Sequence, residues 1–274
     1  MTAQFYVTLP SNASMDTYPN NTVTDYATKL PHPLELDGQW EVGLVEMTYP
    51  ITWYNVERGE CHLLIEFESG EKLSNIKLPE GRYETSRDLV YEIKRLVKKH
   101  IQRYIDAQNA IGNIPDVVLI NDAKNFNQPD IELNEKTQKV AIQTGGCRIV
   151  LSPKLADLLG FEQRLLPKGD KWEAVSAADV NRGYNCLFVY CNVVVDSIVG
   201  DVRAPLLRTV NVKGRYGDSV REIFVKPLYI PVRRNRFDMI EISIKGETGR
   251  PVSFNSGSSC ATLHFKRANT TLGF

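Results

Sequence analysis

The stretch CLFVYCNVVV, Cys186–Val195, decides how the chain folds. Nine of its ten residues are apolar, and only Asn192 interrupts them. It is too short for a membrane-spanning helix, which needs about 20 such residues. Its β-branched and aromatic content, with turn residues on both sides, favours a strand over a buried helix. Because it is apolar at odd and even positions, we expect a central strand with both faces covered, one by the core and one by something else.

Alternating apolar patterns predict strands in the first and last parts of the chain. The predicted strands are Phe5–Leu9, Tyr26–Leu30, Trp40–Pro50, His62–Phe67, Asn75–Leu78, Cys186–Val195, Leu206–Val212, Glu222–Val232, Met239–Ile244 and Ala261–Lys266. Within Trp40–Pro50 the alternation changes phase at Val45, which indicates a bulge or a change of packing surface.

In the middle of the chain the apolar residues recur with a different period. From Thr85 to about Gln108 the apolar residues recur at helical spacing, and Thr85 with Asp88 has the pattern of a capping box. A second, short helix is expected from Ser152 as N-cap to Gly160 just beyond its end. The strand candidates in this part are Val117–Ile120, Ile131–Leu133 and Val140–Ile142. The last two flank Asn134–Lys139, and together they predict a hairpin.

Strands at both ends with an α+β segment between them predict a mainly β fold, a single jelly-roll β-sandwich with an inserted α+β module. We expect residues 1–80 and 173–274 to form the discontinuous sandwich. Residues 81–172 are expected to form the inserted module of helix, hairpin and short helix.

Charge and composition indicate no class of ligand. The 274 residues include 33 basic and 33 acidic side chains, so net charge favours neither nucleic acid nor membrane. The first residues, MTAQFYVTLPS, lack the pattern of a signal peptide, and we expect a protein that is not secreted. The odd, scattered cysteines are then expected to be reduced; they are Cys61, Cys147, Cys186, Cys191 and Cys260.

The sequence offers no reactive constellation. Its four histidines, His32, His62, His100 and His264, stand at no zinc-ligand spacing. Cys61 and His62 are adjacent, so on a strand they point to opposite faces. None of the common nucleotide-binding, hydrolase or zinc-protease motifs occurs. We therefore predict no catalytic, cofactor-binding or metal-binding residues, no cofactor, and a function other than catalysis.

Two basic clusters remain. Lys94, Arg95, Lys98, Lys99 and Arg103 lie on the polar side of the predicted helix, where a solvated face is the ordinary interpretation. Arg233, Arg234 and Arg236 follow a predicted strand. They could contact phosphate, including packaged DNA, or an acidic patch on a neighbouring protein.

The sequence also carries more apolar and aromatic strand than one core requires. The large apolar and aromatic residues within the predicted strands or at their ends include Tyr49, Trp53, Tyr54, Phe188, Tyr190, Phe224, Tyr229 and Ile230. Any of them left exposed in the monomer would mark a protein interface. We expect Tyr190→Asp to abolish folding or assembly if the second face of Cys186–Val195 packs under the inserted module or against a neighbour.

Several blocks in one order resemble a known family. They are FYVTLPSNASM (Phe5–Met15), YPNNTVTDYATKL (Tyr18–Leu30), WEVGLVEMTYP (Trp40–Pro50), LADLLGF (Leu155–Phe161), NRGYNCLFVYC (Asn181–Cys191), VGDVRAPLLRTVNVKG (Val199–Gly214), FVKPLYIPV (Phe224–Val232), FDMIEISIKGETGRPVSF (Phe237–Phe254) and ATLHFKR (Ala261–Arg267). Together they resemble the penton, or minor capsid, proteins of Polinton (Maverick) elements and adintoviruses.

The resemblance implies a structural protein of the virion. It implies a homopentamer at the vertices of an icosahedral capsid, surrounded by trimers of a double jelly-roll major capsid protein, without a membrane partner. Such a protein is made in the cytoplasm or nucleus of the host cell. The inserted module would then project from the sandwich. A carbohydrate- or receptor-binding β-sandwich is the alternative, because jelly rolls also form lectins.

Overall fold

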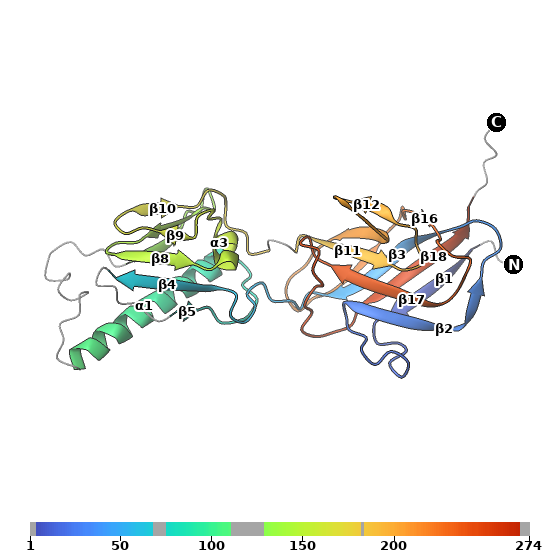
Figure 1. Cartoon of the computed structure of the whole chain (residues 1–274), viewed down its shortest axis with the longest axis horizontal. Coiled ribbons are helices and arrows are strands. Elements are labelled where there is room, and N and C mark those ends of the chain that lie inside the picture. Colours follow the sequence, from blue (N-terminus) through green and yellow to red (C-terminus); the bar gives the residue numbers. More distant parts are fainter. Residues whose placement is uncertain (1–3, 68–74, 111–128, 182–183, 269–274) are drawn as a thin grey trace, which may run out of the picture. The chain divides into compact units, whose positions relative to one another are not determined.

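The computed structural model describes residues 4–67, 75–110, 129–181 and 184–268. The chain divides into two compact units (Figure 1). The first, Met1–Trp53 with Gly183–Phe274, is called the sandwich here; the second, Tyr54–Arg182, is called the insert. The predicted strand candidate Val117–Ile120 lies outside the described residues.

The sandwich contains two antiparallel sheets. The first has the order β1-β18-β3-β15, with short β16 also paired to β3, and the second has the order β14-β11-β17-β2. Their bounds are β1 Gln4–Pro10, β2 Asp25–Glu35, β3 Trp40–Pro50, β11 Cys186–Cys191, β14 Leu206–Asn211, β15 Ser219–Ile223, β16 Ile230–Pro231, β17 Arg236–Lys245 and β18 Cys260–Arg267. Two sheets of four main strands, packed over one apolar core, form a jelly roll, so the predicted mainly β fold is confirmed.

The central strand β11 is shorter than predicted and has one covered face. Leu187, Val189 and Cys191 are buried in the core, whereas Phe188 and Tyr190 alternate with them and are half-buried. The expectation of a strand hidden on both faces is therefore wrong for the isolated chain. Val193 and Val194 follow the end of the strand and are also buried, which explains why the apolar run in the sequence continues past Cys191.

The predicted bulge in β3 is confirmed. Opposite β3, the register of β18 shifts between Thr262, which faces Glu46, and Leu263, which faces Leu44. Val45 is thus the extra residue. The bulge lets Leu44 and Met47, three positions apart, both reach the core and remain fully buried.

Two predicted strands have other bounds. Tyr26–Leu30 extends through Pro31 and Pro33 as part of β2, which the sheet tolerates because β2 is an edge strand. Glu222–Val232 is not one strand. It is divided into β15 and β16 by residues 224–229, which include Pro227.

The insert is larger than predicted. The sequence places its start at residue 81 and its end at residue 172, but β4 (His62–Phe67) and β5 (Ile76–Lys77) form a sheet with β8 (Cys147–Leu151) and β9 (Leu165–Leu166). These strands pair inside the insert, so they cannot belong to the sandwich. A second, three-stranded sheet has the order β10-β7-β6, with bounds β6 Asp130–Leu133, β7 Val140–Gln143 and β10 Lys171–Glu173.

Two helices complete the described part of the insert, and both begin as predicted. Before α1 (Ser86–Ala110), the Thr85 amide donates to the Asp88 carboxylate at 3.0 Å, and the Asp88 amide donates to Thr85 Oγ1 at 3.2 Å. Before α3 (Pro153–Leu159), the Ser152 side chain accepts from the Leu155 amide. Gly160 ends α3 with φ of 81°, a left-handed conformation that glycine adopts without strain. The apolar stripe of α1 packs into the core of the insert.

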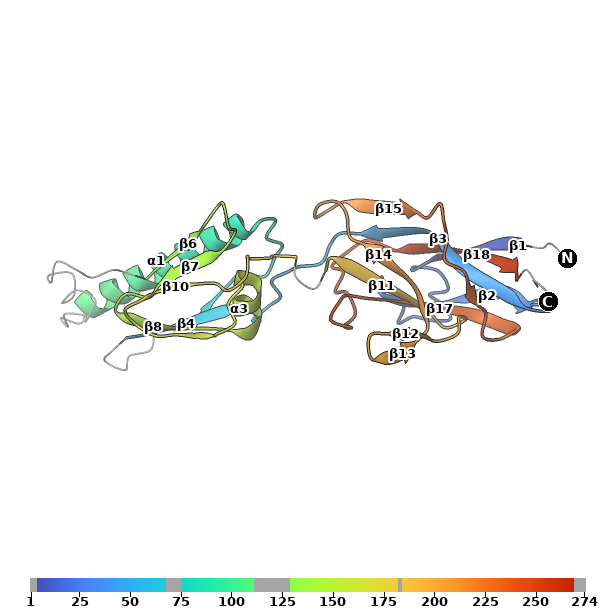
Figure 2. The same ribbon diagram turned by 90° about the horizontal axis from the view of Figure 1, so that it is seen from above.

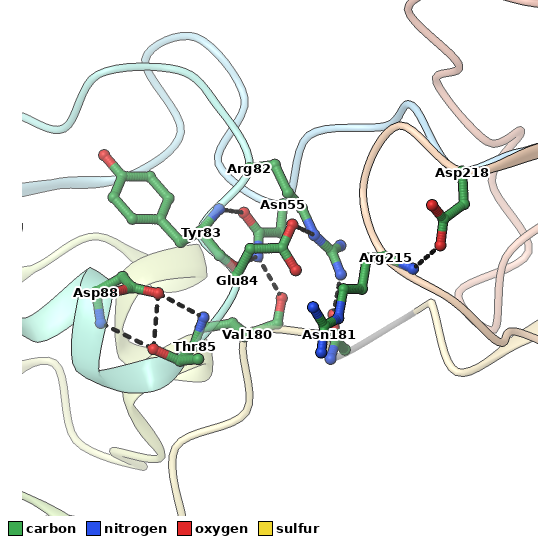
Figure 3. Close-up of polar contacts among 10 residues, drawn as sticks. All are labelled: Asn55, Arg82, Tyr83, Glu84, Thr85, Asp88, Val180, Asn181, Arg215 and Asp218. Atoms are coloured by element: carbon green, nitrogen blue, oxygen red, sulfur yellow. Dashed lines mark hydrogen bonds and ion pairs between the residues drawn. The ribbon is translucent and has the colours of Figure 1, made fainter.

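Asn55 joins the incoming and outgoing segments of the insert (Figure 3). Its amide nitrogen donates to the carbonyl oxygens of Tyr83 at 2.9 Å and Val180 at 2.8 Å, and its side-chain oxygen accepts from the Tyr83 amide at 2.9 Å. The side chain is buried. It therefore holds three backbone groups that water cannot reach easily.

Asn55→Ala is expected to destabilise the insert by about 3 kcal/mol, because three backbone groups lose their partner in a buried place. Urea unfolding of the full chain, followed by a probe in the insert, measures the loss. Lys136→Ala is the control, since Lys136 is exposed and its change should cost less than about 0.5 kcal/mol. Equal stability of the two variants would contradict this role of Asn55.

Candidate assembly surfaces

The histidines and cysteines form no shared site. In the described part of the chain, no group of three or more His, Cys, Asp or Glu side chains is arranged to hold a metal ion. Cys61 is buried and burial raises the pKa of its thiol to about 12, which disfavours a thiolate nucleophile beside His62. Burial raises the pKa values of Cys147 and Cys191 to about 12 as well.

One hollow in the described part of the insert also lacks converging reactive groups. It lies beside α1 and β6 and has an almost wholly apolar lining. Its two charged lining residues, Lys94 and Asp130, pair with each other at 2.8 Å. Neither of the described helices is long and apolar enough to cross a membrane.

The basic clusters are partly neutralised within the chain. In the helix cluster, Lys94 pairs with Asp130, and Arg95 pairs with Glu92 at 2.6 Å. The remaining members, Lys98, Lys99 and Arg103, are exposed.

The arginine loop is likewise partly engaged. Arg233 forms an ion pair with Asp196, and Arg236 lies 3.4 Å from Glu35. Arg234 is exposed. The loop therefore offers a phosphate fewer free cations than its sequence suggests.

The apolar residues most exposed on the sandwich differ from the predicted ones. Tyr49 and Trp53 are fully buried in the core. Phe188, Tyr190, Phe224, Tyr229 and Ile230 of the sandwich, and Tyr54 of the insert, are half-buried. The large apolar side chains that face solvent on the sandwich are Tyr6, Met15, Ile198, Val202, Tyr216, Ile223, Val225 and Leu228.

One group of exposed side chains lies on residues 224–229, which we call the strap. The strap joins β15 to β16 along the edge of β3, and the Phe224 amide donates to the Val45 carbonyl at 2.8 Å. It passes so close to Gly43 that a Cβ there would lie 2.8 Å from the Leu228 carbonyl oxygen. The backbone is thus fixed against the sheet, while the side chains of Val225 and Leu228 face solvent. In the sequence, Pro227 within the apolar run indicates this loop, because proline cannot donate a hydrogen bond to a neighbouring strand.

His264 anchors the end of the strap. Its Nδ1 shares a 2.7 Å hydrogen bond with the Tyr229 hydroxyl, and the exposed Tyr6 ring stacks on it at 4.5 Å. Lys266 lies over the Tyr229 ring at 3.7 Å and pairs with Glu41 at the same distance. His264 is buried, and its Nε2 has no hydrogen-bond partner among the described residues. Burial, assisted by the positive charge of Lys266, lowers the pKa of His264.

The sandwich is therefore expected to lose stability at acidic pH. Because the pKa of His264 is lower in the folded chain, the unfolded chain takes up the proton first. Stability should fall as the pH is lowered from about 7.5 to about 5.5, through the ordinary histidine range. Thermal unfolding of the sandwich at a series of pH values measures this. His264→Asn should flatten the profile, and the exposed His32→Asn should leave it unchanged.

A second group of exposed side chains lies on a hairpin between β11 and β14. Its strands, β12 (Ser197–Val199) and β13 (Val202–Ala204), pair only with each other among the described residues. The two-residue turn has Gly200 with φ of 61°, a conformation suited to such hairpins. Figure 2 shows this hairpin on one side of the sandwich and β15 on the opposite side.

No family model and no curated protein matches this sequence. Among the solved structures that are similar to this chain, two cover almost its whole length. The mavirus penton protein is 13% identical with a TM-score of 0.47, and the similarity covers 97% of this chain and 99% of that one. A chain of the Sputnik virophage, solved by cryo-electron microscopy, is 10% identical with a TM-score of 0.44 and covers 97% of this chain and 98% of its own. At these low identities, neither structure defines a family for the chain.

Proposed function

We propose that this chain is a structural capsid subunit, the penton of a virus-like element of the Polinton or adintovirus kind. It would form a homopentamer at the vertices of the virion and meet trimers of a double jelly-roll major capsid protein there. The observation that carries the proposal is a jelly roll with two groups of exposed apolar side chains, one on residues 223–228 and one on the β12–β13 hairpin. The ordered sequence blocks that resemble the penton family support the same role.

Two separate groups of exposed apolar side chains suit a ring. In a ring each copy presents two different surfaces, one to each neighbour, and the contact repeats until the rotation closes. Monomeric soluble proteins seldom expose clustered apolar side chains without a partner. A subunit that meets its own kind in this way would cover both groups at once.

Ring formation also protects the sheet edges. The first sheet ends in β1 and β15, and the second in β14 and β2. Open edges can pair with other chains and lead to aggregation. A closed ring limits the access of further chains to the edges near each contact.

Light scattering after size exclusion, with class-averaged electron micrographs of the purified chain, tests the proposal. The expected particle is a fivefold ring of about 155 kDa, five times the mass of the 31.0 kDa chain. Incubation with major capsid trimers should incorporate the ring at vertices. A chain that remains a monomer, alone and with the trimers, would contradict the proposal and leave the sugar- or receptor-binding sandwich as the better explanation.

A further inference from the structure

Tyr229, at the end of the strap, is hydrogen-bonded to a buried histidine of the first sheet, His264. Across three strands, Tyr6 of β1 pairs with His264 of β18, and His264 pairs with Gly43 of β3. The strap crosses directly over Gly43, where a Cβ would lie 2.8 Å from the Leu228 carbonyl oxygen and 3.3 Å from the Tyr229 ring. His264 therefore lies between the exposed Tyr6 ring on one side and the strap on the other.

The strap is fixed to the sheet mainly at its two ends, by the Phe224 amide and by β16. Within the described part of the chain, residues 225–229 make no backbone-to-backbone hydrogen bond. The Lys226 carbonyl accepts a long hydrogen bond, 3.4 Å, from the Arg208 guanidinium on the surface. The 2.7 Å bond of the Tyr229 hydroxyl is thus the closest polar contact of residues 225–229 as described. Its loss would free the strap between its two ends.

A neutral His264 already leaves one ring nitrogen without a partner. Nδ1 shares its hydrogen bond with the Tyr229 hydroxyl, and Nε2 has no partner among the described residues, whichever nitrogen carries the proton. The residue is 7% exposed, so water has little access to Nε2. Protonation would place a proton on both nitrogens and leave a charged donor unsatisfied in a buried place.

The titratable and charged groups around His264 do not favour its positive charge. On the same strand, Lys266 lies over the Tyr229 ring at 3.7 Å. Glu41 of β3 is the nearby acidic group, and it pairs with Lys266 at 3.7 Å. Tyr6 and Tyr229 contribute uncharged rings. Burial and, second, the charge of Lys266 therefore lower the pKa of His264 while the strap is in place.

We propose that protonation of His264 releases the strap from the first sheet while both sheets of the sandwich stay folded. When the strap lifts, water reaches the imidazolium, so the open arrangement favours the protonated ring and the closed arrangement favours the neutral ring. Because the pKa is lower in the closed arrangement, acid shifts the equilibrium toward the open one. The shift begins as the pH falls through about 6.5, the ordinary histidine value, and reaches its full extent below the lower pKa of the closed arrangement.

Release would alter an exposed apolar surface. The strap carries Val225, which is 91% exposed, and Leu228, which is 61% exposed. A released strap no longer holds these side chains in a fixed place, so acid would weaken any contact that the strap makes with a partner. The release takes place within one subunit. It goes beyond the capsid role, and its test does not depend on ring formation.

Two measurements on the full chain test the release. NMR titration of the imidazole Cε1–H signals should give His264 a pKa below the ordinary histidine value of about 6.5. Hydrogen–deuterium exchange in peptides covering residues 220–232 should become severalfold faster between about pH 7.5 and about pH 5.0, after correction for the intrinsic rate. Peptides from β11 and β17 should keep their protection over the same range.

Substitutions identify the group responsible. His264→Asn keeps a polar side chain for the Tyr229 hydroxyl but takes up no proton, so exchange in the strap should no longer depend on this titration. Lys266→Met removes the cation that opposes protonation, so the pKa of His264 should rise. Lys245→Met is the matched control, because Lys245 also lies over a tyrosine ring, that of Tyr190 at 5.3 Å, but in the second sheet. It should leave both readouts unchanged.

Several outcomes would overturn the release. A pKa of His264 at or above about 6.5 would mean that the closed strap does not oppose protonation. Strap exchange that is the same at both pH values, or that rises equally in His264→Asn, would remove this histidine as the trigger. Simultaneous loss of protection in β11 and β17 would mean that acid unfolds the whole sandwich. Should His264→Asn fail to fold, the titration and the exchange of the native chain still decide between these outcomes.

Discussion

Removing residues 54–183 and joining Trp53 to Tyr184 through a short glycine linker is expected to leave a folded jelly roll. All the strands of both sandwich sheets lie outside the deleted segment. The two ends to be joined are already close, because the Trp53 and Tyr184 rings stack at 5.6 Å. Trp53 also packs edge-on against Phe254 at 5.5 Å, so its position does not depend on the insert. Cooperative thermal unfolding and a β-type circular dichroism spectrum of the shortened chain measure the result.

A deletion at other bounds gives the control. Removing Glu84–Lys171 takes away β8 but leaves β4 and β5, whose Leu63, Ile65 and Ile76 are buried in the intact insert. These strands would then expose apolar faces and unpaired edges, and we expect aggregation. If both shortened chains fold equally well, β4 and β5 do not need the rest of the insert. If the first is unfolded, the sandwich needs the insert.

The insert begins earlier in the structure than the sequence predicted, and this difference shows what the sequence could and could not predict. His62–Phe67 was identified correctly as a strand, because its alternation is local. Its partner is Cys147–Leu151, more than 80 residues further on, and no local pattern specifies such a pairing. The strand β8 itself went unpredicted. The class of fold therefore follows from local patterns, whereas the division into units depends on long-range pairing.

The helix ends were predicted well for the same reason. Thr85 with Asp88, and Ser152 with Gly160, act within one turn of the chain, so the residue types specify the geometry directly. The bulge at Val45 could also be predicted from the sequence, because the alternation of apolar and polar residues changes phase there.

The assembly surfaces were harder to predict. Sequence shows how much apolar surface a chain has but not which part faces solvent, and Tyr49 and Trp53 proved to be core. The exposed Val225 and Leu228 lie in a run interpreted as strand, in which Pro227 was the overlooked signal. Ile198 and Val202 lie beside the turn residues that follow Cys186–Val195, yet the exposure of their side chains depends on the hairpin pairing with no other described strand of the sandwich.

In strand β11, too, the sequence does not show which apolar residues face the core and which face outward. Two substitutions distinguish the two faces. Leu187→Asp is expected to prevent folding, because Leu187 is fully buried beside Val210 and a carboxylate there costs several kcal/mol out of a domain stability of roughly 5–15 kcal/mol. Tyr190→Asp, three residues away, is expected to fold, since Tyr190 is half-buried on the outer face beneath the Lys245 ammonium.

The cost of Tyr190→Asp should be about 1 kcal/mol, the usual range of strand propensity, and the new carboxylate would lie near a cation. Soluble yield, circular dichroism and urea unfolding compare the two variants directly. Both residues are apolar members of CLFVYC, and the run alone does not say which of them faces the core. Loss of folding in both variants would mean that the outer face is as essential to the subunit as the inner one. A large difference between them means that the two faces have separate roles, with the core behind Leu187 and a surface open to a neighbour around Tyr190.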